Sequence, residues 1–425
     1  MQPSPRSSRR SFLGTTSLAA GAAALAAPAV HAAGDDRLKV GIVGCGGRGA
    51  GAASQALSTS GPVVLTAMGD LFPDRLEQCL RSLKAMDTVG NKVDVPEERR
   101  FTGFDAYERV LDSGIDVILL TTPPHFRPAQ IEAAIAAGKH IFAEKPCAVD
   151  APGVHRVLKA TADARARGLA LVSGLTLRYI DSYREGIRRL HDGAIGEVRT
   201  LLANDYRGAI WSLPRKPEWT DMHWQMRNWP HFTWLSGDFN VEQHVHNLDV
   251  CAWAMRDTYP VRAIGLGGQQ VRKEPGNIYD HHSVVYTYED GTRLVSNCRQ
   301  IPGCKHDISV QVLGSKGTLT LEESKGGVAI TGAETWQFPG TPANGYQVEH
   351  DELFQGIRDG KPVNNGETLA KSTLLAIMGR LATYTGQEIT WDMAWNSKED
   401  FTPASYEWGD RPMPPVAMPG RTKYL

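Results

Sequence analysis

The stretch Leu38-Lys39-Val40-Gly41-Ile42-Val43 runs directly into Gly44-Cys45-Gly46-Gly47-Arg48-Gly49, and this junction decides the fold. The first six residues are mostly apolar and are typical of a buried strand. The glycines that follow fit the pattern G-x-G-x-x-G, in which the first permits a tight turn, the second lets the backbone approach a pyrophosphate and the third lets a helix pack closely. Small residues continue after Gly49 and favour that helix. The stretch therefore predicts the first strand, turn and helix of a dinucleotide-binding domain.

A second apolar run starts at Val63 and ends at Asp70, about 20 residues beyond Gly49, as is usual in dinucleotide-binding domains. A carboxylate at this place accepts hydrogen bonds from the ribose hydroxyls and repels a 2′-phosphate. We therefore expect NAD rather than NADP, although Phe72 and Arg75 lie close enough to alter the preference. The alternative is a glycine-rich turn that binds nothing, which the surrounding strand and helix patterns disfavour.

The length of 425 residues fits two domains. From residue 37 to 172, short apolar runs alternate with helical patterns, which is typical of a doubly wound parallel sheet. The expected strands are 38–43, 63–67, 117–121, 140–142 and 169–172, and the clearest helices are 104–112 and 128–137.

After about residue 176 the pattern changes to that of an α+β domain with a largely antiparallel sheet. We expect helices at 181–190 and 368–383, and strands at 198–204, 261–265, 283–288, 293–298, 308–313 and 317–322. The fold class is thus α/β, with an N-terminal Rossmann domain at 33–176 and a substrate and oligomerisation domain at 177–395. A proline-rich tail at 396–425 is expected to be extended, over the surface or over a partner subunit.

Residues 1–32 have the pattern of an export signal. The segment Ser8-Arg9-Arg10-Ser11-Phe12-Leu13-Gly14 carries two adjacent arginines, and an alanine-rich apolar run that ends in small residues follows. Val30-His31-Ala32 offers a cleavage site, and Ala27-Pro28-Ala29 is the alternative. The order of these features predicts a twin-arginine signal peptide, and the alternative is a disordered basic tail. Twin-arginine export carries folded proteins, so we expect a periplasmic or extracellular protein that holds its cofactor tightly.

The composition narrows the classes of partner that the protein is expected to bind. The chain has 46 basic and 47 acidic residues, so it has no basic field to attract nucleic acid or anionic lipid. We expect no nucleic acid and no stable membrane association. Six scattered cysteines form no C-x-x-C pair, which gives no support for a zinc knuckle.

Two further motifs follow predicted parallel strands, at the edge where such sheets bind ligands. The first motif comes at the end of the expected strand 117–121 and reads Thr121-Thr122-Pro123-Pro124-His125. The second follows the expected strand 140–142 and reads Glu144-Lys145-Pro146. An ammonium at this position can hold a substrate hydroxyl and stabilise alkoxide charge. A lysine in a loop can equally be a solvated charge.

Taken together, these motifs at these spacings resemble the glucose–fructose oxidoreductase and inositol dehydrogenase family, Gfo/Idh/MocA. The resemblance implies a Rossmann domain followed by an open-faced sheet, NAD(H) or NADP(H), sugar or polyol substrates, and a homodimer or homotetramer. It also implies that Lys145 is the active-site lysine. The residues expected at the cofactor are Gly44, Gly46, Gly47, Arg48, Gly49, Asp70, Thr122, His125, Glu144 and Lys145.

The segment 237–249 contains two histidines and three carboxylates, of which Glu242 and Asp249 flank the histidines. If it is one helix, Glu242, His246 and Asp249 share a face and His244 points elsewhere. A histidine beside a carboxylate can act as a general base near neutral pH. Relatives in the resembled family commonly carry Asp four residues before the catalytic His, so Glu242 is a departure. Two interpretations compete with the general base. One is a metal site of two histidines and a glutamate. The other is a histidine buried at a domain interface.

Five of the ten tryptophans lie between residues 211 and 234. Their flat faces suit sugar rings, or they pack a long loop or a subunit interface. By resemblance, Arg178 and Tyr179 lie near the mouth of the cleft. The residues expected on the substrate side are Arg178, Tyr179, Trp229, Trp234, His244 and Asp249.

The leading hypothesis is an exported oxidoreductase with tightly bound NAD. A substrate hydroxyl carbon gives its hydride to the nicotinamide, His246 takes the hydroxyl proton and Lys145 stabilises the alkoxide. Because free NAD is scarce outside the cytoplasm, the cofactor is reset in place, under a lid formed by the tail after Thr402 or the residues before Arg37. One alternative is a redox-neutral glycosidase that oxidises, eliminates, hydrates and reduces. The other is a non-catalytic sugar-binding protein.

Overall fold

The computed structural model describes residues 36–322 and 327–425, and the statements below concern these residues. The predicted signal peptide lies outside them. No helix of the described ranges is long and apolar enough to cross a membrane.

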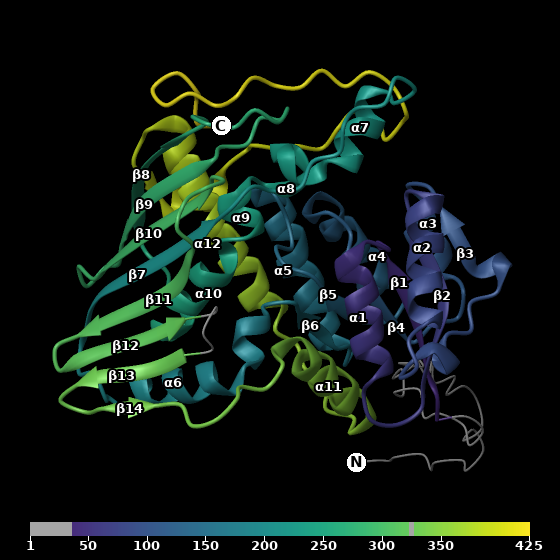
Figure 1. Cartoon of the computed structure of the whole chain (residues 1–425), viewed down its shortest axis with the longest axis horizontal. Coiled ribbons are helices and arrows are strands. Elements are labelled where there is room, and N and C mark those ends of the chain that lie inside the picture. Colours follow the sequence, from purple (N-terminus) through teal and green to yellow (C-terminus); the bar gives the residue numbers. More distant parts are fainter. Residues whose placement is uncertain (1–35, 323–326) are drawn as a thin grey trace, which may run out of the picture. The chain divides into compact units, whose positions relative to one another are not determined.

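The first sheet is parallel and six-stranded, with the order β3-β2-β1-β4-β5-β6 (Figure 1). Its strands are β1 (Leu38–Val43), β2 (Val63–Asp70), β3 (Arg100–Thr102), β4 (Val117–Leu120), β5 (His140–Ala143) and β6 (Leu171–Ser173). The helices of this part are α1 (Gly47–Leu57), α2 (Pro73–Lys84), α3 (Ala106–Leu111), α4 (Arg127–Ala136) and α5 (Ala151–Ala166). This is the predicted doubly wound sheet.

The strands are apolar because helices cover both faces of the sheet. Every residue of β2 and of β4 is buried, and in β1 only Lys39 is exposed. The expected strand from Val63 is three residues longer than predicted and ends at Asp70 itself. The carboxyl ends of β1, β2 and β4 lie in register, since Val43 pairs with both Gly69 and Leu120.

The second sheet has nine strands in the order β14-β13-β12-β11-β7-β10-β9-β8-β15. The strands are β7 (Val198–Arg207), β8 (Arg262–Gly268), β9 (His281–Thr287), β10 (Arg293–Gln300), β11 (Asp307–Gly314), β12 (Gly317–Glu322), β13 (Gly327–Gly332), β14 (Trp336–Gln337) and β15 (Ile389–Thr390). β7 and β10 run parallel, and the other pairs are antiparallel, so the prediction of a largely antiparallel second sheet is confirmed.

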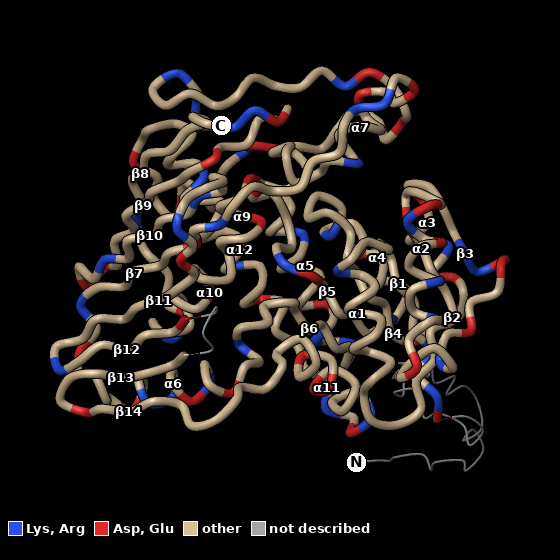
Figure 2. The backbone as a smooth tube through the Cα atoms, viewed as in Figure 1, with Lys and Arg blue, Asp and Glu red and all other residues tan. Residues whose placement is uncertain are grey.

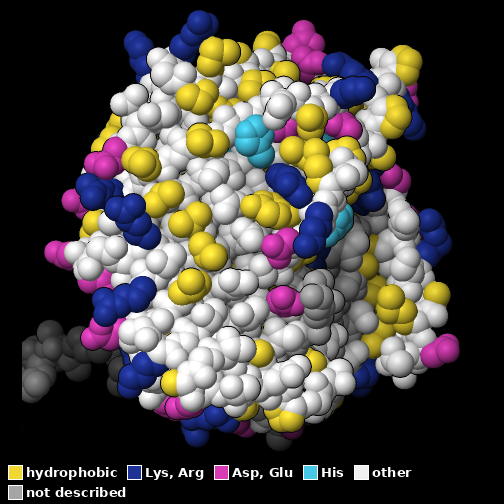
Figure 3. All heavy atoms as spheres, turned by 60° about the vertical axis from the view of Figure 1, so that its left-hand side comes forward, with side chains coloured by type: hydrophobic (Ala, Val, Ile, Leu, Met, Phe, Trp, Pro, Cys, Tyr) yellow, Lys and Arg dark blue, Asp and Glu magenta, His cyan; other side chains and the backbone are white. Residues whose placement is uncertain are grey.

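Burial alternates along β9 and β10, as expected for a sheet with one covered face. The covered face carries α6 (Asp181–His191), α10 (Val245–Ala254) and α12 (Gly366–Thr385) (Figure 1). Figure 3 looks onto the opposite side, where apolar side chains lie scattered among uncharged ones.

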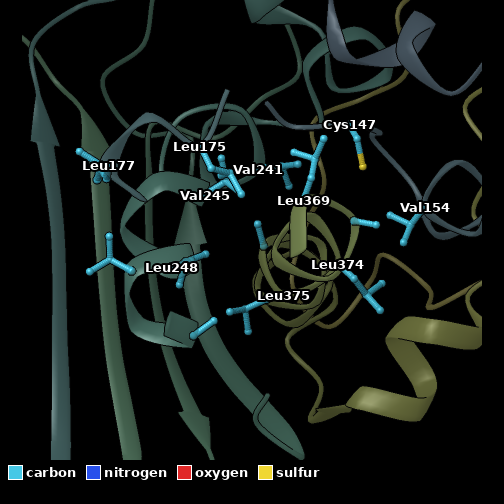
Figure 4. Packing of buried hydrophobic residues seen from close by; sticks show 14 of the residues in the cluster. Cys147, Val154, Leu175, Leu177, Val241, Val245, Leu248, Leu369, Leu374 and Leu375 are labelled. Carbon is cyan, nitrogen blue, oxygen red and sulfur yellow. The ribbon is translucent and has the colours of Figure 1, made fainter. Parts of the chain in front are cut away.

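The core joins the two sheets through α12. Nearly every residue of this helix is buried, so it is apolar all round rather than along one stripe. Figure 4 shows it end-on, with Leu369, Leu374 and Leu375 facing Leu248 on one side and Val154 on the other. The prediction of a late helix is confirmed. The domain boundaries stay a prediction.

Two later segments return to the first sheet or run over the surface. The helix α11 (Gly345–Arg358) packs against α1, and the Gln347 side chain donates to the Gln55 carbonyl at 3.1 Å. After α13 (Trp391–Asn396) the chain has no helix or strand. This tail contacts its own chain, as where Gly420 N donates to the Thr385 carbonyl at 2.8 Å.

Candidate active site

The glycine loop has two tightly packed glycines and two that face open space. Gly44 has φ +96°, and a Cβ there would lie 2.6 Å from the Thr121 carbonyl carbon. A Cβ on Gly49 would lie 1.9 Å from the Gly44 oxygen, whereas one on Gly46 or Gly47 would meet nothing within 4 Å. Gly46 caps α1 without any side-chain hydrogen bond. The free amides at this helix start and the space before them fit a phosphate group.

Asp70 lies at the end of β2 and is 9% exposed. One carboxylate oxygen accepts from Cys45 N at 2.6 Å and the other from Phe72 N at 2.8 Å. Burial raises the pKa of Asp70, and these two hydrogen bonds oppose the rise. The carboxylate is thus oriented by the glycine loop and has lone pairs left for ribose hydroxyls.

A cleft of about 550 Å³ runs along the glycine loop, a size that suits a cofactor. One wall comes from the carboxyl ends of the parallel strands, including Asp70 and Thr122. The other wall comes from the tryptophan-rich segment and contributes Trp211, Arg227 and Trp229. Trp229 therefore lies at the nucleotide cleft, and its expected role toward the substrate stays a prediction.

A chain of contacts links the glycine loop to the lysine of the Glu-Lys-Pro motif. Arg48 Nε donates to Glu144 Oε1 at 2.6 Å, and Glu144 Oε2 accepts from Lys145 N at 3.1 Å. Lys145 Nζ lies 3.0 Å from Glu242 Oε1 and donates to the Glu242 backbone oxygen at 2.5 Å. The structure thus brings together Arg48, Glu144, Lys145 and Glu242, which come from three distant parts of the sequence.

The segment 237–249 is not one helix, which was the condition for placing Glu242, His246 and Asp249 on a common face. A short helix, α9 (Phe239–Glu242), ends at Glu242, and α10 starts at Val245. Between them Gln243 has φ −111°, which turns the chain. Glu242 therefore does not share a helical face with His246 and Asp249, and it reaches Lys145 from the end of α9.

His246 lies in the first turn of α10 and is partly buried. Its Nδ1 has no hydrogen-bond partner among the described residues. Burial holds the pKa of His246 well below its usual range, and the charges of Lys145, Arg207 and Arg48 lower it further. The ring is therefore neutral at neutral pH, which is the form that a general base requires.

His244, which was expected on the substrate side, is fully buried. Its Nε2 lies 2.7 Å from the Ser296 hydroxyl oxygen, and its Nδ1 lies 4.0 Å from an Asp205 oxygen. Burial lowers the pKa of His244 to about 3. With no exposed surface, His244 presents nothing to a ligand in this conformation.

The other expected substrate residues have internal partners. Arg178 forms two hydrogen bonds to Asp249, at 2.8 and 2.9 Å, and Asp249 also accepts from the Ser372 hydroxyl. The Tyr179 hydroxyl accepts from Asn365 at 2.5 Å. Trp234 donates to the Gln225 side chain at 2.7 Å. These contacts join helices to one another, and the substrate roles of these residues stay predictions.

Of two further expected cofactor residues, Thr122 lines the cleft and His125 does not. Thr122 donates to the Gln130 side chain at 2.7 Å. His125 Nε2 is hydrogen-bonded to the Tyr406 hydroxyl at 2.8 Å, so it contacts the C-terminal tail. Burial lowers the pKa of His125 to about 4.

Sequence reasoning missed Arg207 and Arg227. Arg207 ends β7, and its Nε lies 2.6 Å from Asp205 Oδ1. Nothing in the local sequence placed it near His246, because the two meet only through the packing of β7 on α10. Across the described ranges, no three His, Cys, Asp or Glu side chains come together in a way that could hold a metal ion.

Comparison with known proteins agrees with this geometry. Residues 38–171 match a family described as an oxidoreductase family with an NAD-binding Rossmann fold, Gfo/Idh/MocA. Over 283 residues the chain is 24% identical to the inositol 2-dehydrogenase/D-chiro-inositol 3-dehydrogenase of Lactiplantibacillus plantarum. The aligned stretch covers 67% of this chain and 71% of that relative.

Solved structures share the fold. The WlbA dehydrogenase from Bordetella pertussis, in complex with NADH and UDP-GlcNAcA, superposes with a TM-score of 0.65 at 19% identity, over 83% of this chain and 98% of that one. The aldose-aldose oxidoreductase from Caulobacter crescentus, complexed with glycerol, superposes with a TM-score of 0.64 at 18% identity, over 83% and 99%.

Proposed function

We propose that the protein is an oxidoreductase of the Gfo/Idh/MocA family, whose NAD-binding Rossmann model matches residues 38–171. In this proposal it transfers a hydride between NAD and a hydroxyl-bearing carbon of a sugar or polyol. The observation that carries the proposal is the cluster of Lys145, Glu242 and a neutral His246. Glu144 links this cluster to Arg48, which lines the nucleotide cleft. The names of the similar proteins, which speak of inositols and aldoses, support the substrate class.

The residues of this cluster have distinct tasks. Glu242 holds the Lys145 ammonium through its carboxylate and its backbone oxygen. Lys145 donates a hydrogen bond to the substrate oxygen and stabilises the negative charge that develops there. His246 accepts the hydroxyl proton, because its ring is neutral and surrounded by cations that disfavour an early protonation. NAD supplies a hydride acceptor when bound.

The cofactor proposal has two finer parts. Asp70 favours NAD over NADP, because a 2′-phosphate would meet a carboxylate. The second part is tight binding, which the twin-arginine pattern supports, since an exported protein reaches a compartment with little free NAD. The cofactor is then reset within each reaction cycle, and the protein acts in the periplasm or outside the cell.

The proposal can be tested with purified full-length protein in two measurements. The nucleotide released on denaturation is identified by mass spectrometry, and a panel of sugars and polyols is screened for a change in NADH absorbance. We expect NAD(H) and a change with at least one member. A nucleotide-bound protein that is silent toward every sugar and polyol would contradict the proposal.

Two further results would assign the reaction differently. Cleavage of an unactivated glycoside without a second sugar would indicate the redox-neutral glycosidase. Sugar turnover that is unchanged in Lys145→Ala would remove the catalytic role of Lys145. Sugar binding by the native protein without any turnover would favour a sugar-binding protein.

A further inference from the structure

Two segments from outside the Rossmann domain lie together over the nucleotide cleft. One is α7 (Asp221–Arg227), which belongs to the tryptophan-rich stretch, and the other is the tail segment 404–411. Figure 1 shows α7 and the yellow tail beside one another, and Figure 2 shows charged residues of both signs along them. Arg227 lines the cleft, as do Asp70 and Phe72.

Hydrogen bonds make α7 and this tail segment one unit. Met222 N donates to the Gly409 carbonyl at 3.1 Å, and the Gln225 side chain donates to the Arg411 carbonyl at 2.7 Å. In the reverse direction, Arg411 N donates to an Asp221 carboxylate oxygen at 3.2 Å. These three hydrogen bonds join the two segments to each other.

An ion pair fastens this unit to the start of α2. The two terminal nitrogens of Arg227 donate to the two carboxylate oxygens of Asp74, each at 2.7 Å. The Arg227 guanidinium also lies 3.7 Å above the Phe72 ring, only two residues from Asp70. The Arg227 side chain is 13% exposed, whereas that of Asp74 is 61% exposed. The contact thus sits at the outer edge of the ribose end of the cleft.

Aromatic side chains add a second contact. Trp408 of the tail lies 5.8 Å from Phe72 and 5.2 Å from Phe104, measured between ring centroids. The Tyr406 ring lies 5.6 Å from Phe104, and its hydroxyl bonds His125. Phe72 and Phe104 follow β2 and β3, so the tail spans the adenosine side of the Rossmann domain.

We propose that α7 and residues 404–411 form a clasp that must detach from α2 before the nucleotide can leave, with the Asp74–Arg227 ion pair as its latch. The proposal rests on the proposed function in assuming that the cleft holds NAD. It gives the tryptophan-rich stretch a role in retaining the cofactor. Because the Asp74 side chain is largely exposed, added salt should weaken its ion pair with Arg227.

The test uses two variants whose altered side chains do not line the cleft. Asp74→Asn removes the latch from the Rossmann side, and Trp408→Ala removes the aromatic contact. Asp163→Asn is the matched control, because Asp163 pairs with Lys159 on the exposed side of α5, away from the cleft. Each protein is loaded with NADH and mixed with excess NAD, and the loss of NADH fluorescence gives the release rate.

We expect release at least tenfold faster in Asp74→Asn and Trp408→Ala and an unchanged rate in Asp163→Asn. Added salt should speed release from the native protein more than from Asp74→Asn. Equal release rates in all four proteins would overturn the clasp while leaving the proposed function intact. If Trp408→Ala does not fold, the release rate of Asp74→Asn alone tests the clasp. A native protein that binds no NADH would contradict the proposed function, and the clasp with it.

Discussion

Lys145 and His246 could be proposed as site residues from the sequence, but their neighbours could not. The motifs around these two residues are short stretches of sequence, so they can be recognised without knowledge of the fold. The contact of Lys145 with the Glu242 backbone oxygen depends on where α9 ends. The cations that act on His246 come from β7, from the loop after β5 and from α1, so only the tertiary structure reveals the sign of its pKa shift.

At the same scale, His246→Ala should lower the hydride-transfer rate by roughly 10²–10⁴-fold, the usual loss for a general base. NADH should still bind, because His246 does not line the nucleotide cleft. Stopped-flow measurement of NADH formation and a separate NADH titration check the two parts. In the native protein the rate should stay on its plateau down to about pH 6.5, because the lowered pKa of His246 keeps the ring neutral there. An acid limb above pH 7 would argue against this histidine as the base.

His244 carries a prediction about stability. Its pKa is about 3 in the folded chain against 6.5 for the unperturbed group, so the unfolded chain binds the proton more strongly. Its contribution to stability is therefore complete above pH 6.5 and is lost as the pH falls toward 3, by up to about 1.4 kcal/mol per pH unit. Urea unfolding at a series of pH values measures the slope. His244→Asn should flatten the slope, and an unchanged slope in that variant would assign the pH dependence to other groups.

At the scale of elements, the strands of the Rossmann sheet were the easiest to predict. They are buried on both faces, so each is a short apolar run between glycines or polar turns. The break between α9 and α10 was missed, because the sequence from 239 to 254 has no proline and no glycine to mark it. The turn at Gln243 places Glu242 on Lys145 and His246 on the next helix, so the error fell on the candidate site.

The glycine loop offers a paired prediction for one element. Gly46→Ala should fold with an unchanged melting temperature, because its Cβ would meet no atom, yet it should weaken NADH binding by filling the phosphate space. Gly49→Ala should lower the melting temperature, because its Cβ would lie 1.9 Å from the Gly44 oxygen. Differential scanning fluorimetry and NADH titration of both variants check the pair. The opposite ranking of their melting temperatures would contradict this account of the loop.

At the scale of the whole molecule, the two sheets and their order in the chain could be predicted, but their connection could not. The helix α12 was expected, yet its role as the shared core of both sheets depends on contacts with residues more than a hundred positions away, such as Leu248 and Val154. The tail was expected to be extended. Its pairing with α7 could not be predicted, since neither segment has a repeating pattern that reveals a partner.

The most direct test of the central claim follows the hydride itself. The full chain is loaded with NAD and mixed with sugars and polyols that carry deuterium on their hydroxyl-bearing carbons, and the nucleotide is analysed by mass spectrometry. Our account predicts that deuterium appears in the bound NADH with at least one of these substrates, and that it appears far more slowly in His246→Ala. A nucleotide that stays bound and unlabelled with every sugar and polyol of the panel would contradict it.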